Sequence, residues 1–131
     1  MDDIVGQLRE TFKDEAYEQL ADLEATLLEL EKVPEDKDLI GRAFRAMHTI
    51  KGSGAACEFQ DIVAFTHDVE TAFDLVRKGK LRATREIIDI TLSACDQIRA
   101  MLDVFYKGGT ADPSKCRDIT EALNRLTREG A

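Results

Sequence analysis

Two histidines, a lysine and a glutamate stand close together in the middle of the chain, as His48, Lys51, His67 and Glu70. A carboxylate that accepts the Nδ1–H of an imidazole fixes the tautomer of the ring and orients it. The Nε2 lone pair then faces outward, where it can act as a nucleophile toward a group that another protein delivers. These residue types therefore predict a nucleophilic histidine supported by an acidic neighbour.

Helical spacing places His48 and Glu70 on matching sides of two neighbouring helices. At about 100° per residue, His48 lies about 80° from Ile40, and Glu70 lies about 80° from Ile62. Both residues are 11 positions from Phe59, which lies near the expected turn between the helices. Equal offsets at equal heights on antiparallel helices lead us to expect that Glu70 meets His48.

The surroundings of His48 favour access to its ring. On the same helix, Gly41 and Gly52 lie at about 100° and 120° from the start of the apolar stripe, directly beside the histidine. Glycine within a helix costs roughly 1 kcal/mol relative to alanine, so we interpret Gly52 as keeping one flank of the imidazole bare. Lys51 could offset the charge of an incoming phosphoryl group, and His67 lies nearby on the next helix.

Other chemistries fit these residues less well. A di-iron bundle needs Glu-x-x-His, but Arg45 and Ala64 stand three positions before the two histidines. The GSG stretch is no phosphate-binding loop, because Lys51 precedes the glycines and no GxxxxGK[ST] motif occurs. The spacings support no Ser-His-Asp or Cys-His arrangement. The structural alternative is that His48 is simply an exposed surface residue.

Apolar residues recur every three or four positions in five stretches, which predicts five helices beginning near residues 4, 36, 59, 84 and 112. The apolar faces include Ile4 and Leu8 in the first helix and Phe105 in the fourth. Thr84 is an expected N-cap, and Asp112 precedes a proline at a first helical position. Short connections make neighbouring helices antiparallel.

We therefore expect a single all-α domain over residues 1–131. It consists of an antiparallel, up-down four-helix bundle over about residues 4–106. A fifth helix, over about residues 112–128, packs outside the bundle and leads to a linker.

Composition indicates which binding partners and which cellular location to expect. Hydrophobic residues make up 44% of the 131 residues, and the net charge of −8 argues against nucleic-acid or anionic-membrane binding. Three widely spaced cysteines without a CxxC pattern indicate reduced thiols. No secretory signal opens the chain, and no apolar run approaches the ~18 residues needed to cross a bilayer. We expect a cytoplasmic protein.

The stretches FRAMHTIKGSGAACEF and FTHDVETAFDLVRKGKL resemble the histidine phosphotransfer (HPt) family, and most closely the N-terminal phosphotransfer domain of the chemotaxis histidine kinase CheA. The resemblance implies that His48 Nε2 receives the γ-phosphoryl group of ATP from the kinase domain. It also implies that Glu70 bonds Nδ1 and that Lys51 and His67 complete the network. The phosphoryl group would then pass to an Asp of a response regulator of the CheY or CheB type.

The same resemblance implies that this chain is part of a histidine kinase but is not a kinase by itself. ATP and Mg²⁺ would be bound by the partner domains, and this domain would hold no cofactor. Cys57 and Glu58 stand where the family commonly has smaller or glycine-rich residues. Two alternatives stay open. One is an HPt domain of another phosphorelay, and the other is a catalytically silent helical interaction domain.

Overall fold

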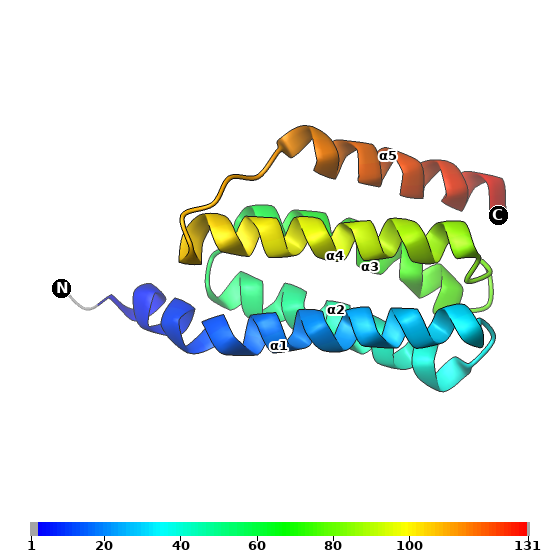
Figure 1. The fold of residues 1–131 in the computed structure, drawn as a ribbon, viewed down its shortest axis with the longest axis horizontal. Helices are drawn as coiled ribbons and strands as arrows, with labels where there is room; N and C mark the ends of the chain where they lie inside the picture. Colours follow the sequence, from blue (N-terminus) through cyan, green and yellow to red (C-terminus); the bar gives the residue numbers. More distant parts are fainter. Residues whose placement is uncertain (1–2, 131) are drawn as a thin grey trace.

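Five helices form the regular structure of the computed structural model, which describes residues 3–130 (Figure 1). They are α1 (Ile4–Lys32), α2 (Lys37–Ala56), α3 (Gln60–Arg77), α4 (Arg85–Tyr106) and α5 (Pro113–Gly130). Each begins within a residue or two of the predicted position. The fifth helix extends two residues beyond the predicted end.

Side-chain caps explain where α4 and α5 start. Thr84 Oγ1 accepts a hydrogen bond from the backbone N–H of Ile87 at 3.2 Å, which confirms the predicted N-cap of α4. Asp112 Oδ1 accepts from the backbone N–H of Ser114 at 2.9 Å before α5 begins at Pro113. These bonds satisfy backbone donors that the first turn of a helix leaves without partners.

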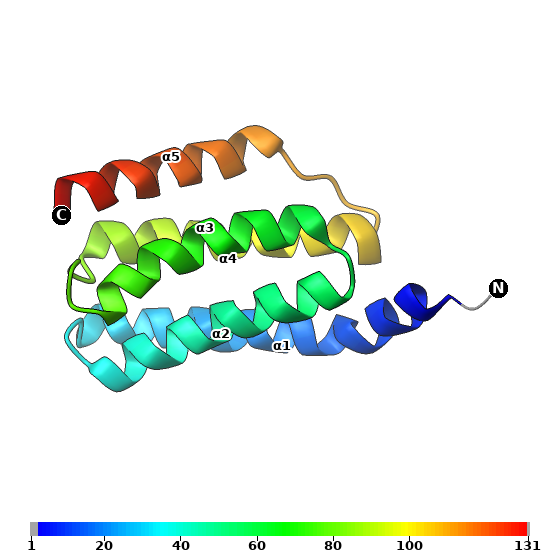
Figure 2. The ribbon, with the colours of Figure 1, turned by 180° about the vertical axis from the view of Figure 1, so that it is seen from behind.

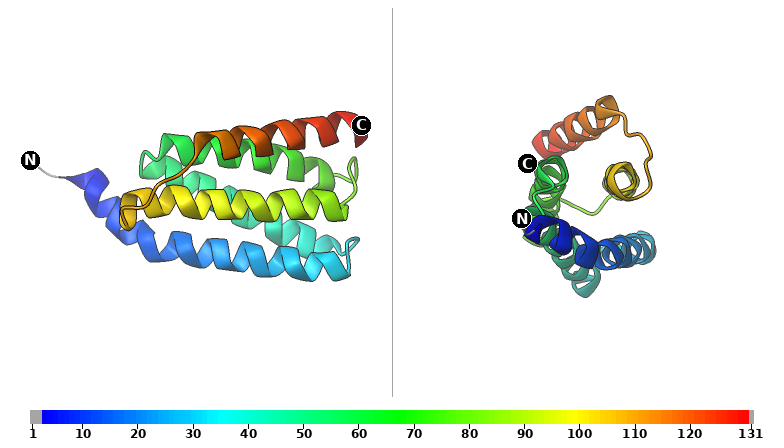
Figure 3. Two further views of the ribbon diagram at one scale, coloured as in Figure 1. Left: turned by 45° about the horizontal axis from the view of Figure 1, so that its top comes forward. Right: turned by 90° about the vertical axis from the view of Figure 1, so that its left-hand side faces the viewer.

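The first four helices run up and down as an antiparallel bundle in which α1 packs on α2 and α4, and α3 packs on α2 and α4. Seen from behind, α2 and α3 lie side by side in front (Figure 2). Helix α5 lies outside this bundle against α3 and α4 (Figure 3). The predicted fold class is confirmed.

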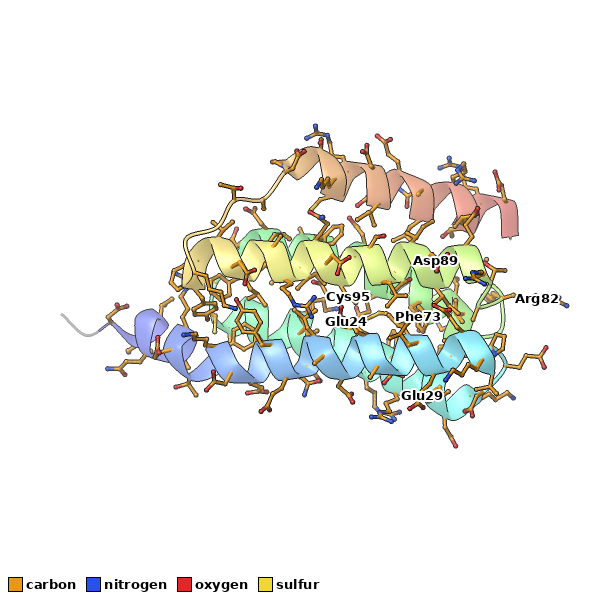
Figure 4. The ribbon with its side chains drawn as sticks, in the orientation of Figure 1. Glu24, Glu29, Phe73, Arg82, Asp89 and Cys95 are labelled. Atoms are coloured by element: carbon orange, nitrogen blue, oxygen red, sulfur yellow. The ribbon has the colours of Figure 1, made fainter. Side chains whose placement is uncertain are left out.

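The core of the bundle is mainly aliphatic. Phe73 is the largest of its fully buried side chains, and it lies between the helices in Figure 4. The core weakens toward the end of the bundle that holds the N-terminus of α1. Ile4, Leu8 and Phe105 are 62%, 42% and 51% exposed, so their predicted place on buried faces is wrong. Helix α1 projects beyond its neighbours at this end, so the apolar spacing of Ile4 and Leu8 continues where no packing surface remains (Figure 1). Phe105 contacts the ring of Phe59 with centroids 5.3 Å apart but leaves half of its side chain exposed.

Helix α5 is attached by few buried side chains. Leu123 is its fully buried residue among the described side chains, while Cys116, Ile119 and Leu126 are half-buried against the core. Over residues 3–130, no helix combines the length and the hydropathy that a membrane span requires.

Candidate functional site

The turn between α2 and α3 sets the height at which the two helices meet. Glu58 takes a left-handed backbone with φ of 59°, and the Phe59 N–H donates to Gly54 O at 2.9 Å. Arg9 of α1 braces this turn, because its Nε donates to Cys57 O at 2.8 Å. This tight connection keeps α2 and α3 in the register that the equal spacing from Phe59 predicts.

Three of the predicted site residues meet across α2 and α3. The Nδ1 of His48 lies 2.7 Å from Glu70 Oε2. Lys51 Nζ donates to the other carboxylate oxygen, Glu70 Oε1, at 2.6 Å. Because an ionised carboxylate only accepts hydrogen bonds, Nδ1 carries the proton and Nε2 of the neutral ring keeps its lone pair. Glu70 therefore holds the histidine and is itself held by the lysine.

Burial differs sharply within this group. Only 9% of the Glu70 side chain is exposed, against 23% for Lys51 and 66% for His48. The carboxylate is thus rigidly enclosed while the imidazole stands open to solvent. An oriented and accessible imidazole is the arrangement that a nucleophile for an incoming protein partner requires.

The charge of Glu70 is stabilised by its partners. Burial alone raises the pKa of the Glu70 carboxyl, but the hydrogen bonds from Lys51 and His48 outweigh it, so the pKa lies below its usual value. Glu70 is therefore ionised at neutral pH. Lys51, which we expect to offset the charge of an incoming phosphoryl group, uses one of its three ammonium donors in the bond to this carboxylate.

His67 lies beside the group without bonding it. Its exposed ring lines a depression of about 640 Å³ together with His48 and Glu70. Within residues 3–130, the ring of His67 makes no hydrogen bond. The backbone carbonyl of His67 accepts a hydrogen bond from Thr71 Oγ1 at 2.9 Å. The structure thus places His67 at the rim of the site and leaves its ring outside the hydrogen-bonded group.

The glycines of α2 divide into three different environments. A Cβ atom at Gly52 would meet nothing within 4 Å, so this flank of the helix is open. The flank at Gly41 is covered, because a Cβ there would lie 3.2 Å from Arg45 Nη1. Gly54 is buried, and a Cβ atom at this position would lie 3.4 Å from Val63 Cγ2. The bare flank predicted for His48 is therefore provided by Gly52 and not by Gly41.

Sequence reasoning missed an aromatic and ionic cluster on the other side of His48. The ring of Phe44 stacks on the imidazole with centroids 6.5 Å apart and planes at 15°. The guanidinium carbon of Arg77 lies 4.6 Å from the centroid of the Phe44 ring, and Arg77 also bonds Asp74. Phe44 precedes His48 by four positions, and Asp74 follows Glu70 by four. That spacing is the signal that could have revealed them.

The acidic and thiol side chains of residues 3–130 were the other candidates for a metal or redox site. Among residues 3–130, no group of three or more His, Cys, Asp or Glu side chains is arranged to hold a metal ion. The three cysteines are free, and burial raises the pKa of the Cys95 thiol to about 12. The His48 group is therefore the arrangement with a clear chemical use.

Comparison with known proteins agrees with this geometry. The Hpt domain model matches residues 7–106. The chain belongs to the Hpt domain family. This Hpt domain is 32% identical over 122 residues to the chemotaxis protein CheA of Rhizobium meliloti, and 35% identical over 127 residues to the sensor histidine kinase CheAY of Helicobacter pylori. These alignments cover 93% and 96% of this chain but only 16% of each relative.

Solved structures share the fold of this Hpt domain. The phosphorylated P1 domain of CheA3 from R. sphaeroides, in complex with CheY6, has a TM-score of 0.83 and 25% identity, with 95% of this chain and 98% of that chain covered. The CheA phosphotransferase domain from Thermotoga maritima has a TM-score of 0.73 and 36% identity, with 79% of this chain and 98% of that chain covered. The similarity thus extends to phosphotransfer domains of CheA.

Proposed function

We propose that this Hpt domain is the phosphoacceptor and phosphotransfer domain of a CheA-type chemotaxis kinase that works in the cytoplasm. The observation that carries the proposal is the 2.7 Å contact between His48 Nδ1 and Glu70 Oε2, made by an imidazole that is 66% exposed. Glu70 fixes the tautomer and Lys51 fixes Glu70. The Nε2 lone pair is then available on an open face of the molecule.

Transfer proceeds in two displacements. The Nε2 lone pair attacks the γ-phosphorus of ATP bound to the kinase domain, the Nε2–P bond forms, and the bond from phosphorus to the bridging oxygen breaks to release ADP. A carboxylate oxygen of a response-regulator Asp then attacks the same phosphorus and the Nε2–P bond breaks. Glu70 stabilises the positive charge that develops on the ring in the first step and holds the ring during the second.

The partners follow from the chemistry. The donor is the kinase domain of the same protein family, which supplies ATP and Mg²⁺, and the acceptors are response regulators of the CheY or CheB type. The CheA3 P1 domain that was solved in complex with CheY6 supports the second step for a domain of this fold. The open flank at Gly52 supports the close approach of both partners.

Incubation with a CheA kinase core and labelled ATP tests the proposal. We expect His48 to take up label that is stable to base and lost in acid, and we expect the label to move to a CheY-type regulator. In His48→Gln the labelling should disappear while helicity and melting temperature stay nearly unchanged, because the ring is exposed. Label that persists at His67 in this variant would overturn the assignment.

The same experiment separates the two alternatives. An Hpt domain of another phosphorelay should be labelled poorly by a CheA kinase core but well by its own donor. A catalytically silent interaction domain should take up no label from either source.

A further inference from the structure

The hydrogen bond that His48 Nδ1 donates to Glu70 is a limited restraint on the plane of the His48 ring. The ring is attached to the chain through Cγ, and this hydrogen bond adds one contact, at Nδ1, so a single contact opposes rotation about Cβ–Cγ. The side chain is 66% exposed, so little packing restrains it elsewhere. The direction of the Nε2 lone pair depends on the plane of the ring, so a second restraint would affect the reaction directly.

Phe44 provides such a restraint from the preceding turn of α2. Its ring centroid lies 6.5 Å from that of His48, and the two planes are within 15° of parallel. This is an offset-stacked pair at a separation where aromatic rings attract one another. Because Phe44 is half-buried against the core, its ring is held more firmly than the histidine it contacts.

Arg77 holds the Phe44 ring in turn. Its guanidinium carbon lies 4.6 Å from the Phe44 ring centroid, within the range of a cation–π contact. Asp74 Oδ1 accepts hydrogen bonds from Arg77 Nε at 3.0 Å and from Arg77 Nη2 at 2.6 Å, and Lys78 Nζ lies 2.9 Å from Asp74 Oδ2. The guanidinium is therefore fixed in place by α3.

We infer that Phe44 is a positioning residue for His48, held by Arg77, and that this stack sets the plane of the imidazole while Glu70 sets its tautomer. The inference rests on the proposed function of His48 as phosphoacceptor. Arg77 presents its guanidinium to the Phe44 ring, and Asp74 accepts hydrogen bonds from the Nε and Nη2 of that guanidinium. In-line attack on phosphorus requires an aligned lone pair, so loss of the stack should lower the rate of transfer.

The test compares four variants of this domain. Phe44→Leu keeps an apolar side chain but removes the ring, and Phe44→Tyr keeps the ring. Arg77→Lys keeps the charge but removes the flat guanidinium. Arg85→Lys is the matched control, because Arg85 is 84% exposed on α4, lies outside the His48 depression and also has an acidic partner on its own helix, Asp89.

Two measurements are needed for each variant: the rate of labelling by a CheA kinase core, and the NMR order parameter of the C–H bonds of the His48 ring. We expect Phe44→Leu to slow labelling about 10-fold and to lower the ring order parameter. Arg77→Lys should do the same to a smaller extent, about 3-fold in rate. Phe44→Tyr and Arg85→Lys should behave as the parent in both measurements.

The outcomes that overturn the inference are distinct from failure of the proposed function. An unchanged ring order parameter in Phe44→Leu would overturn it even if labelling slows, because Phe44 would then be a contact surface for the kinase. A lowered order parameter with an unchanged rate would also overturn it. If the parent takes up no label, the proposed function fails, while the order parameters still decide whether Phe44 restrains the imidazole. If Phe44→Leu fails to melt cooperatively, Arg77→Lys and Phe44→Tyr carry the test.

Discussion

At the scale of single residues, Glu70 is the side chain on which the site depends. It is buried, it bonds His48 and Lys51 with different oxygens, and a smaller residue would leave both without a partner. We expect Glu70→Ala to slow labelling of His48 by about 10²-fold, the effect of losing an acid–base partner. Glu31→Ala is the control, since it removes an acidic side chain of α1 that does not line the His48 depression. Labelling of Glu70→Ala at the parent rate would contradict the role of Glu70.

The pH dependence of the site follows from the lowered pKa of Glu70. A carboxyl whose pKa is lower in the folded state stabilises the protein above its unfolded pKa of about 4.3, and this stabilisation is lost as the pH falls through the folded value. We therefore expect the bonds of Glu70 to be intact at neutral pH and to be lost only in acid, at a pH below the pKa of an unfolded glutamate. An NMR titration of the Glu70 carboxyl carbon measures this directly.

Lys51→Met is the matched variant for that titration. It removes one of the two hydrogen bonds that lower the pKa of Glu70, while the burial that raises it remains. The midpoint should move upward relative to the parent. An unchanged midpoint would mean that Lys51 does not bond the carboxylate in solution.

At the scale of the helices, we expect a substitution at Gly52 to affect the stability of the domain and the labelling of His48 differently. Its flank is open, so Gly52→Ala should stabilise the domain by up to roughly 1 kcal/mol, because alanine is the better helix former. Gly52→Gln should also fold, but its side chain one turn after His48 should block the partners and slow labelling sharply. Thermal melts and labelling rates check both variants.

Ala64→Gln is the control for that pair, because it places the same side chain at an exposed position of α3 outside the His48 depression. It should leave labelling unchanged. If Gly52→Gln is labelled as fast as the parent, the glycine does not serve access.

The turn between α2 and α3 offers a second test at this scale. Glu58 has a φ of 59°, a conformation that favours glycine over residues with a Cβ. Glu58→Gly should raise the free energy of unfolding by about 0.5–1 kcal/mol through relief of this strain. Glu18→Gly in the exposed interior of α1 should lower it by about 1 kcal/mol. Urea unfolding of both variants measures the difference, and a loss of stability in Glu58→Gly would show that no strain is relieved.

At the scale of the whole molecule, α5 is an addition to a bundle that is complete without it. The Hpt domain match ends at residue 106, and α5 contributes Leu123 as its fully buried residue among the described side chains. A chain that ends at Gly108 should still melt cooperatively and be labelled at the parent rate. Exposing the surface that Leu123 covers costs about 2 kcal/mol, so the melting temperature should fall by roughly 10 °C.

Leu123→Ala is the companion variant, since it removes the buried side chain and keeps the helix. It should also lower the melting temperature, and it should leave the labelling of His48 unchanged. A truncated chain that is folded but no longer labelled would instead place α5 in the contact with the kinase.

The sequence by itself determined the helices, their caps and the pairing of His48 with Glu70. Helical periodicity and N-caps are local properties, so Thr84 and Asp112 could be recognised without any knowledge of packing. The short turn around Phe59 made the relative height of α2 and α3 calculable as well. These features depend only on the spacing of residues along the chain, so they can be read directly from the sequence.

Only the tertiary structure decided which neighbours the flexible and peripheral side chains take. Lys51 has several rotatable bonds, so its bond to Glu70 could not be derived from helical angles. The same holds for the contact of Arg77 with the Phe44 ring, which joins two helices. The exposure of Phe105 depends on where the neighbouring helices end. A residue's periodicity gives the direction in which it points, while its burial depends on what the rest of the chain places there.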